Sequence, residues 1–521
     1  MSLGDPARNC HGISRCVSTA SQRGRHTRRQ DTRRHKAFSV YNPVQQADAR
    51  LGITRNRGGT VRQRDRTPNT ALKALLAGGG VTYDALATCI RMTAAETGRT
   101  LRTNRSAVAH WISGTPPAPT TVPVIVEALC RLLGRSLSAA EIGLAQLASD
   151  DLISWDADTL AALGELGRRD LDVERRQALA VAAYSLQALA LPGDRWWAHR
   201  AEKSAHPSGA NGRRVGRGDL EAVREMVAAF SRIDQRHGGG HARTAVVQYL
   251  ITDVSNYLHG RFIDDHVRND MFSAASELAY LAGWTAFDNS EHAVAQRYFV
   301  SALKLAAEAN NPPTAGHALR GMAYQAVDLG HGAQAVGLIE AAMEGKRYSL
   351  ASSRERSMFG AQLARSQAAA GRHKAAAAAL ARAESDLASD RSRTEEPGRL
   401  FIFGEADLTF QRAYTLRDFG DLHGAAREFR RSVRIRNSTA FARVHVVTLG
   451  ELASLQVRQG AVEEACATWS RALDAMDGIQ SARTRRVASD MRQALSPLRR
   501  RGIRAVAQLD NRAAAYLRDS V

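Results

Sequence analysis

A column of small and bulky residues recurs five times in the second half of the chain, and it constrains the fold more than any other feature. Each copy runs small residue, Gly or Ser seven later, Ala five later, a bulky apolar residue four later and a small residue three later. Residues three and four apart lie on one face of an α-helix. The column therefore predicts two helices joined by a tight turn, with small residues where the helices touch. The copies begin at Gly283, Ala323, Ala364, Ala413 and Ala453.

The copies follow one another at a nearly fixed period. The alanines of their second helices (Ala295, Ala335, Ala376, Ala425 and Ala465) are 40, 41, 49 and 40 residues apart. Such a period predicts a helical solenoid. The column resembles the tetratricopeptide repeat over residues 276–479, although its period is longer than that family's usual spacing of about 34 residues. The resemblance implies stacked helix pairs, so we expect a repeat array over residues 269–480 and capping helices over 481–521.

Composition supports an all-α fold and excludes several classes of protein. Apolar residues make up 44% of the 521 residues but aromatic residues only 6%, and the many alanines favour close-packed helices. No apolar run reaches the roughly 18 residues of a membrane span, so we expect no membrane partner. Five scattered cysteines without a CxxC pair are typical of a reduced, cytoplasmic protein.

Positive charge is concentrated at the amino terminus. The net charge is +20, and residues 1–68 hold fifteen Arg or Lys against four Asp or Glu. This segment lacks apolar periodicity and is predicted to be a disordered arm, residues 1–67. Two interpretations remain open. The arm adds phosphate contacts to a nucleic acid, or the translation start has been placed too far upstream.

Composition changes at Pro68, where a small helical domain is predicted over residues 68–147. Asn69 or Thr70, Thr82, and Thr103 or Asn104 are suitable helix caps, and Val108, Trp111 and Ile112 are predicted to face the domain core. About a dozen polar residues separate the second and third helices. The predicted helices cover residues 70–78, 83–90, 105–113, 122–134 and 137–144.

The exposed polar start of the third helix resembles the recognition helix of the Xre and lambda-repressor type of helix-turn-helix. In that family, the first turn of this helix enters the major groove of double-stranded DNA. The resemblance places base or backbone contacts at Asn104, Arg105, Ser106, Ala109 and His110, and phosphate contacts at Arg102 and Lys73. The alternative is a small helical domain that contacts other proteins.

Residues 148–268 are predicted to be a helical linker region with a long loop near 192–218. Two patterns there contain residue types that occur in catalytic or metal sites. The His237–His241 segment, HGGGH, lacks the partner motifs of esterases and zinc proteases, and a glycine turn explains it better. Asp264, Asp265 and His266 are metal-ligand types, but a polar helix start explains them better. We predict no catalytic residues, metal or cofactor, and hence no enzyme.

The inner face of the array is a candidate groove for an effector, a peptide or a partner protein. The candidate groove residues are polar or aromatic and lie on or near the first helix of a pair: Tyr257, Tyr324, Gln325, Arg365, Arg412 and Arg458. The alternative is a structural array that mediates dimerisation.

The order of parts resembles actinomycete regulators of development and secondary metabolism, which place such a helix-turn-helix before a tetratricopeptide array. The similarity runs through NRSAVAHWISGTPPAP and ELAYLAGWTAFDNSEHAVAQRYFVSALKLA, within residues 68–500. It implies a DNA-binding transcriptional regulator, associated with the nucleoid and acting as a homodimer on paired half-sites. The alternative is a protein-interaction adaptor that does not bind DNA.

Overall fold

The computed structural model describes residues 67–96, 99–135, 137–144, 152–172, 175, 176, 179, 183–203, 212–389, 396–499 and 504–519. Among them almost all regular structure is helical, and the exception is one pair of two-residue strands. The predicted all-α fold is confirmed. The predicted arm, residues 1–67, lies outside the described residues except for its last one.

The predicted small domain contains four α-helices. They are α1 (Thr70–Gly78), α2 (Tyr83–Ala95), α3 (Arg105–Ile112) and α4 (Val122–Leu133), with a 3-10 turn, η1 (Pro119–Thr121), before α4. Of the candidate caps, Asn69 and not Thr70, Thr82, and Asn104 and not Thr103 each accept a hydrogen bond from the first turn of their helix. The prediction of a helix over residues 137–144 is wrong. The chain forms turns there because Gly143, at φ 67°, reverses it after one turn.

The region between the small domain and the array has one helix that was not predicted, α7, and lacks the helix predicted over residues 183–192, where only a 3-10 turn forms. It contains α5 (Thr159–Leu171), η2 (Gln187–Leu189), α7 (Asp194–Lys203), α8 (Arg217–His237), α9 (Gly239–Tyr249), the π-helical turn η3 (Leu250–Val254) and α10 (Ser255–Leu258). Strands β1 (Arg214–Val215) and β2 (Arg261–Phe262) pair in parallel. Helix α7 corrects the prediction of a continuous loop over 192–218. Trp196 donates to the Trp155 carbonyl at 3.0 Å and Arg200 pairs with Glu308 at 2.7 Å, which fixes this segment.

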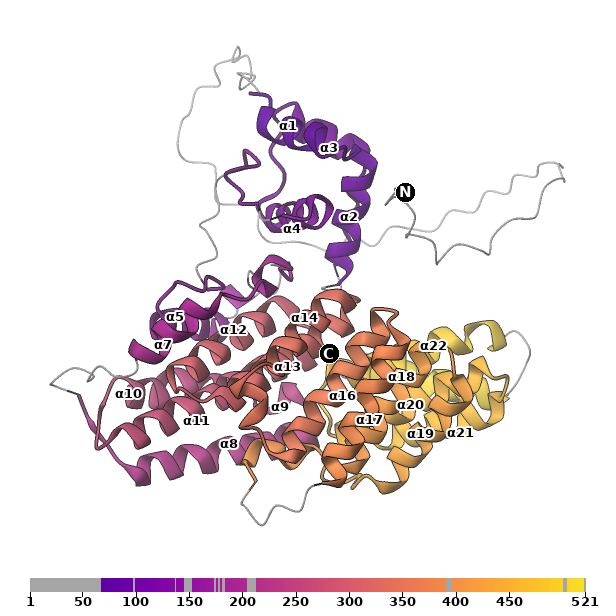
Figure 1. The fold of residues 1–521 in the computed structure, drawn as a ribbon. Helices are drawn as coiled ribbons and strands as arrows, with labels where there is room; N and C mark the ends of the chain where they lie inside the picture. The colour runs from indigo at the N-terminus through magenta and orange to yellow at the C-terminus, as the bar shows by residue number, and fades with distance from the viewer. Residues whose placement is uncertain are drawn as a thin grey trace, which may run out of the picture. The chain divides into compact units, whose positions relative to one another are not determined.

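The array consists of five helix pairs that pack one after another (Figure 1). The pairs are α11 (Asp265–Asp288) with α12 (His292–Glu308), α13 (Pro312–Asp328) with α14 (Gly332–Ala342), α16 (Ser353–Ala369) with α17 (His373–Ala388), α18 (Glu405–Asp418) with α19 (Leu422–Ile435), and α20 (Ala442–Arg458) with α21 (Val462–Asp474). A short helix, α15 (Lys346–Ser349), precedes α16, and a 3-10 turn, η4 (Gly398–Ile402), precedes α18. Since α11 begins at Asp265, the array starts four residues before the predicted boundary.

Each position of the recurring column has its predicted role. All five turn residues have positive φ: Ser290 62°, Gly330 84°, Gly371 74°, Gly420 87° and Gly460 83°. The alanines of the second helices are fully buried, as is Trp469. A Cβ on Gly283 would lie 2.8 Å from the Phe299 ring, closer than real Cβ atoms come to a neighbour. The column is therefore the contact line between the two helices of each pair.

The longest interval between copies, 49 residues, contains an insertion. It lies between α17 and α18 and includes η4, where Leu400 is buried in the main core. Arg399 in this turn pairs with Glu277 of α11 at 3.0 Å and with Glu355 of α16 at 2.9 Å. The insertion thus reaches back to the first pair of the array.

The curved array also closes on itself through a buried ion-pair network. Arg443 of α20 is fully buried and pairs with Asp234 of α8 at 2.9 Å and with Asp288 of α11 at 2.8 Å. The second carboxylate oxygen of Asp288 accepts from the Gly239 backbone N–H at 2.9 Å. Gly238, at φ 85°, begins the turn between α8 and α9. The HGGGH segment is therefore the junction of α8 and α9, where the chain turns at Gly238 as the glycines predicted, and Gly239 contacts the end of α11.

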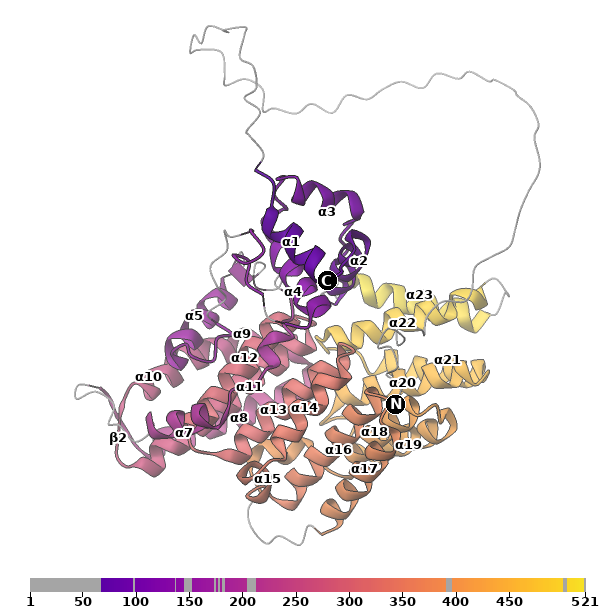
Figure 2. The ribbon, with the colours of Figure 1, turned by 45° about the horizontal axis from the view of Figure 1, so that its top comes forward.

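Two further helices, α22 (Ala482–Arg499) and α23 (Arg504–Asp519), follow the last pair (Figure 2). Leu495, Val506 and Leu509 share one buried core with Trp469 of α21. This placement is that of the predicted capping pair. Within the described residues, no helix has the length and apolar character needed to cross a bilayer.

Candidate nucleic-acid interface

The start of α3 is held in place from two sides. The Asn104 side chain accepts from the Ala107 N–H at 2.9 Å, which satisfies one of the free N–H groups of the first turn. Arg91 of α2 donates to the carbonyl of the buried Thr103 at 2.6 Å. These bonds fix the direction in which the chain enters α3, and hence the direction of the side chains on its first turn.

The opposite face of α3 is buried in the core of the small domain. Val108, Trp111 and Ile112 pack with residues of α1, α2 and α4, as their spacing predicted. The backbone N–H of Asn69 donates to the Ile112 carbonyl at 2.8 Å and links the start of α1 to the end of α3. One face of α3 is thus fixed by packing, and the other remains available to a ligand.

The residues predicted to contact DNA are mostly exposed. Arg102, Asn104, Arg105, Ser106 and His110 are exposed, and Ala109 is half-buried. Lys73, on α1, is also exposed. The structure therefore brings together the residues at the start of α3 and leaves them accessible. The side-chain oxygen of Asn104 already accepts the capping hydrogen bond, so only its amide N–H groups can bind a ligand.

The arginines of the small domain differ in whether they have an ion-pair partner. Arg131 is bound by Glu96 at 2.6 Å and by Glu127 at 2.7 Å, and burial raises the pKa of the Glu127 carboxyl although Arg131 acts against it. Arg102 and Arg105, in contrast, form no ion pair with any carboxylate of the described residues. The start of α3 therefore carries two positive charges without a carboxylate partner among the described residues.

The segment between α2 and α3 is shorter than the dozen residues that the sequence suggested, and so is closer in length to the turn of a helix-turn-helix. Helix α2 runs to Ala95, beyond its last predicted residue Ile90, so residues 96–104 separate the two helices. Thr93 and Ala94 are buried, which explains the extension: the α2 core stripe continues for another turn. The connection is still longer than a turn of a few residues.

The six predicted groove residues do not form one exposed groove. Tyr324, Gln325 and Arg365 are buried, so the prediction of a groove open at these side chains is wrong. The Arg365 guanidinium lies over the Tyr324 ring at 4.3 Å, and Arg483 of α22 donates to the Tyr324 hydroxyl at 3.2 Å. The capping helix fills the inner face at this point, which repeat spacing alone did not indicate.

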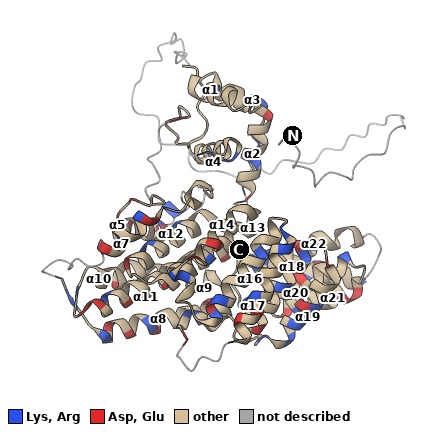
Figure 3. Ribbon diagram, viewed as in Figure 1, with Lys and Arg blue, Asp and Glu red and all other residues tan. Residues whose placement is uncertain are grey.

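The other three predicted groove residues are scattered. Arg412 of α18 is half-buried and pairs with Glu384 at 2.9 Å. Arg458 is exposed at the end of α20. Tyr257 of α10 is half-buried beneath Arg213, whose guanidinium lies 4.7 Å from the ring centre. Lys and Arg positions are interspersed with Asp and Glu positions along the helices of the array (Figure 3).

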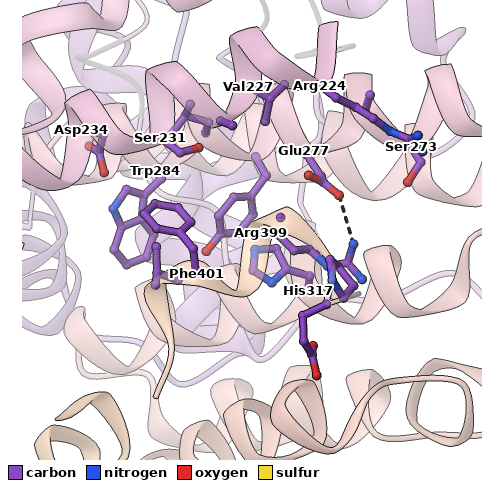
Figure 4. Close-up of a pocket in the computed structure, with 18 of the residues that line it drawn as sticks. Arg224, Val227, Ser231, Asp234, Ser273, Glu277, Trp284, His317, Arg399 and Phe401 are labelled. Atoms are coloured by element: carbon purple, nitrogen blue, oxygen red, sulfur yellow. Dashed lines mark hydrogen bonds and ion pairs between the residues drawn. The ribbon is translucent and has the colours of Figure 1, made fainter. Parts of the chain in front are cut away.

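A partly open pocket that sequence reasoning missed lies where α8, α11 and α13 meet the insertion around η4 (Figure 4). Asp234, Trp284 and His317 line it. The one signal in the sequence was the 49-residue interval between repeats, because the extra residues supply one wall. Within the described residues, no group of three or more His, Cys, Asp or Glu side chains is arranged to hold a metal ion. The polar helix start predicted at Asp264, Asp265 and His266 is the start of α11, and Asp264 is its cap.

Comparison with known proteins bears on the small domain alone. Residues 72–145 match the family described as the SP15 N-terminal domain. These residues nearly coincide with the domain predicted over 68–147, from α1 to the turn after α4. None of the curated proteins searched matches the chain. The chain therefore carries, over α1 to α4, a domain similar to the SP15 N-terminal domain.

Proposed function

We propose that this protein is a transcriptional regulator that binds double-stranded DNA through the start of α3. The observation that carries the proposal is the exposed polar cluster at the start of α3, with Arg102 before the helix and Arg105, Ser106 and His110 on it, while the remaining side chains of α3 are packed in a core. An exposed helix tip with unneutralised arginines fits the major groove, where Arg binds guanine through two hydrogen bonds.

The charge arrangement supports a nucleic-acid ligand over a protein ligand. The acidic residues Glu96 and Glu127 are neutralised by Arg131 away from the tip, and Lys73 adds an exposed cation on α1. Phosphate groups attract such a surface at low salt, and each phosphate neutralised adds to the salt dependence of binding. Nucleoid association in the cytoplasm and action as a homodimer on paired half-sites belong to this proposal.

The test is selection of bound duplexes from a random-sequence library with the full chain, followed by titration of the selected duplex. We expect affinity to fall steeply with salt. Arg105→Ala should reduce discrimination between the selected duplex and a scrambled one by about 1–3 kcal/mol. Arg168→Ala, which removes an arginine of α5 with a 62% exposed side chain, is the matched control and should bind as wild type does.

The second candidate function, a protein-interaction adaptor, is favoured by the array itself, because stacked helix pairs present extended surfaces to other proteins. The same experiment separates the two. If the library yields no enriched sequence, or if Arg105→Ala binds every duplex as wild type does, DNA reading through α3 is excluded and the adaptor becomes the better proposal.

A further inference from the structure

Residues 184–186, which we call the connecting segment, are bound by the small domain at both of their ends. The Leu186 N–H donates to the Glu127 carboxylate of α4 at 3.0 Å. The Tyr184 carbonyl accepts from the Arg131 guanidinium of the same helix at 3.2 Å. Glu127 and Tyr184 are buried, and a polar group that loses its partner in the interior is costly. The small domain therefore holds the connecting segment by its backbone.

The array binds the middle residue of the same segment. The Ser185 N–H donates to Gln296 Oε1 of α12 at 2.9 Å, and Gln296 Nε2 donates to the Ser185 carbonyl at 2.7 Å. The side-chain amide thus pairs with one backbone residue through a donor and an acceptor together. Gln296 is fully buried in the first helix pair of the array. The connecting segment is therefore bonded to the small domain and to the array at the same time.

A second contact lies beside the connecting segment, at the turn between α13 and α14. The His331 ring is stacked on the Tyr184 ring, with centres 5.8 Å apart and planes 6° from parallel. His331 Nε2 lies 3.6 Å from a carboxylate oxygen of Glu96, the residue that ends α2. The two oxygens of Glu96 also accept from Arg131, at 2.6 and 2.9 Å. The array therefore reaches the small domain both through α12 and through this turn.

The hydrogen bonds on the small-domain side are charge-assisted. Glu96 and Glu127 both bind Arg131. Burial acts to raise the pKa of Glu96, but hydrogen bonds from His331 and Arg131 hold that pKa below its usual value, so Glu96 is ionised at neutral pH. Hydrogen bonds to an ionised group are about twice as strong as those between neutral groups. The contact is thus stronger and more directional than apolar packing alone.

Helix α4 links this contact to α3. Glu127 and Arg131 bind the connecting segment. Ala128 and Leu129, their neighbours on α4, are fully buried in the core of the small domain, which also contains Trp111 of α3. Close-packed cores have few voids and transmit strain. A shift of α4 therefore reaches the helix whose exposed start is the proposed DNA contact.

From this arrangement we infer that the connecting segment is a regulatory relay between the array and the small domain. The bonds of Gln296 and the contacts of His331 hold α4 in place through residues 184–186, and loss of either contact loosens α4. Such coupling is reciprocal, so a change in α4 also reaches the array. The relay is a property of the chain alone and does not depend on what α3 binds.

The test is hydrogen exchange of the full chain without DNA, read by mass spectrometry, with Gln296→Ala as the array variant. We expect the backbone amides of α4 to exchange at least fivefold faster than in wild type, because local opening becomes easier when the segment is released. Gln362→Ala, which removes an equally buried glutamine of α16, is the matched control and should leave α4 unchanged. Faster exchange that stops at α12 and the connecting segment, or equal acceleration of α4 in the control, overturns the inference.

Two variants of Leu186 isolate one hydrogen bond and keep the test decisive should Gln296→Ala fail to fold. Leu186→Pro removes the N–H that donates to Glu127, and the Leu186 φ of −67° is one that proline adopts. Leu186→Ala shortens the same side chain but keeps the N–H. We expect exchange of α4 to be at least fivefold faster in Leu186→Pro than in Leu186→Ala. Equal exchange of α4 in the two variants contradicts the relay.

Reciprocity allows a check from the small domain. Arg131→Met removes the guanidinium that binds Glu96 and the Tyr184 carbonyl, so amides of the connecting segment and around His331 should exchange at least threefold faster. Arg135→Met is the control, because Arg135 has a 53% exposed side chain and pairs with Glu141 inside the small domain. Unchanged exchange around His331 in Arg131→Met would show that the coupling does not reach the array, which overturns the inference.

Discussion

The small domain and the array use arginine in opposite ways. At the start of α3, Arg102 and Arg105 are exposed and form no ion pair with a described carboxylate. In the array, Arg443 is fully buried between Asp234 and Asp288, and Arg399 joins the insertion to two helices. The same residue type therefore provides a free positive surface in one region and internal connections in the other.

This difference indicates where substitutions should affect function and where they should affect stability. An exposed arginine contributes little to the free energy of unfolding, so changing it alters mainly what the surface binds. A buried arginine between two carboxylates is different, because its removal leaves two charges buried without a partner. Comparing one substitution in both regions tests whether this distinction holds.

The largest expected effect is that of Arg443→Met. It should lower the free energy of unfolding of the array by about 3–5 kcal/mol, because Asp234 and Asp288 lose their shared partner in the interior. Urea denaturation followed by circular dichroism measures the change. The same substitution at Arg105, in the exposed first turn of α3, should change stability by no more than about 0.5 kcal/mol.

A control on the same helix separates the network from the properties of α20. Arg458→Met changes an exposed arginine near the end of that helix and should behave like Arg105→Met. If Arg443→Met costs no more than Arg458→Met, the ion-pair network does not close the array. Adding Asp234→Asn and Asp288→Asn to Arg443→Met should restore part of the loss, since no unpaired charge then remains buried.

A smaller effect is expected from Gly283→Ala in α11. The new methyl group would lie 2.8 Å from the Phe299 ring and 3.1 Å from the Ala295 carbonyl oxygen, and overpacking of this kind costs about 1–3 kcal/mol. The midpoint of thermal unfolding measures it. The other four copies of the column have alanine at this position, so Gly283 distinguishes the first pair.

The counterpart in the small domain is Gly78→Ala at the end of α1. Gly78 has no atom within 4 Å of an added Cβ, and alanine is favoured over glycine in a helix by about 0.5–1 kcal/mol. The two substitutions should therefore have opposite signs. A stabilising Gly283→Ala would show that the contact between the first two helices of the array can relax.

The sequence predicted the contacts that repeat along the chain and missed those that occur once. Five copies in register predicted the turn at Gly460 and the burial of Trp469, because each copy supports the others. Arg443 and Asp234 are 209 residues apart and occur once each, so no period indicates that they meet. The burial of Tyr324 beneath Arg483 depends on the return of α22 to the array, which helix spacing does not specify.

Short-range sequence patterns predicted the small domain well, because its helix caps and core positions depend on residues that are close together in the sequence. The caps at Asn69, Thr82 and Asn104 act within three residues, so their effect can be read from adjacent positions. The exposure of Ser106 and His110 follows from the burial of Val108 and Ile112 on the other face of the same helix, whereas Arg105 is exposed as the first residue of α3. What short-range patterns could not supply is the ligand that this face contacts, since exposure does not specify a partner.

The smallest predicted effect concerns pH and a buried histidine of the array. Burial, together with Arg320 and Arg399, holds the pKa of His317 well below its usual value of 6.5. The unfolded chain therefore takes up this proton first, so the stability that neutral His317 contributes is present above pH 6.5 and is lost as pH falls below it. The expected loss is about 1.4 kcal/mol per pH unit.

The measurement is the difference in free energy of unfolding between wild type and His317→Phe, at pH values from 7 to 5. Carboxylates such as Asp234, whose pKa burial raises to about 6, are present in both proteins, so the difference isolates the imidazole. His110→Phe, at an exposed histidine of α3, controls for the general effect of removing one imidazole. A constant difference between wild type and His317→Phe over this range would mean that His317 takes up its proton equally in the folded and unfolded chains, which its burial beside two arginines argues against.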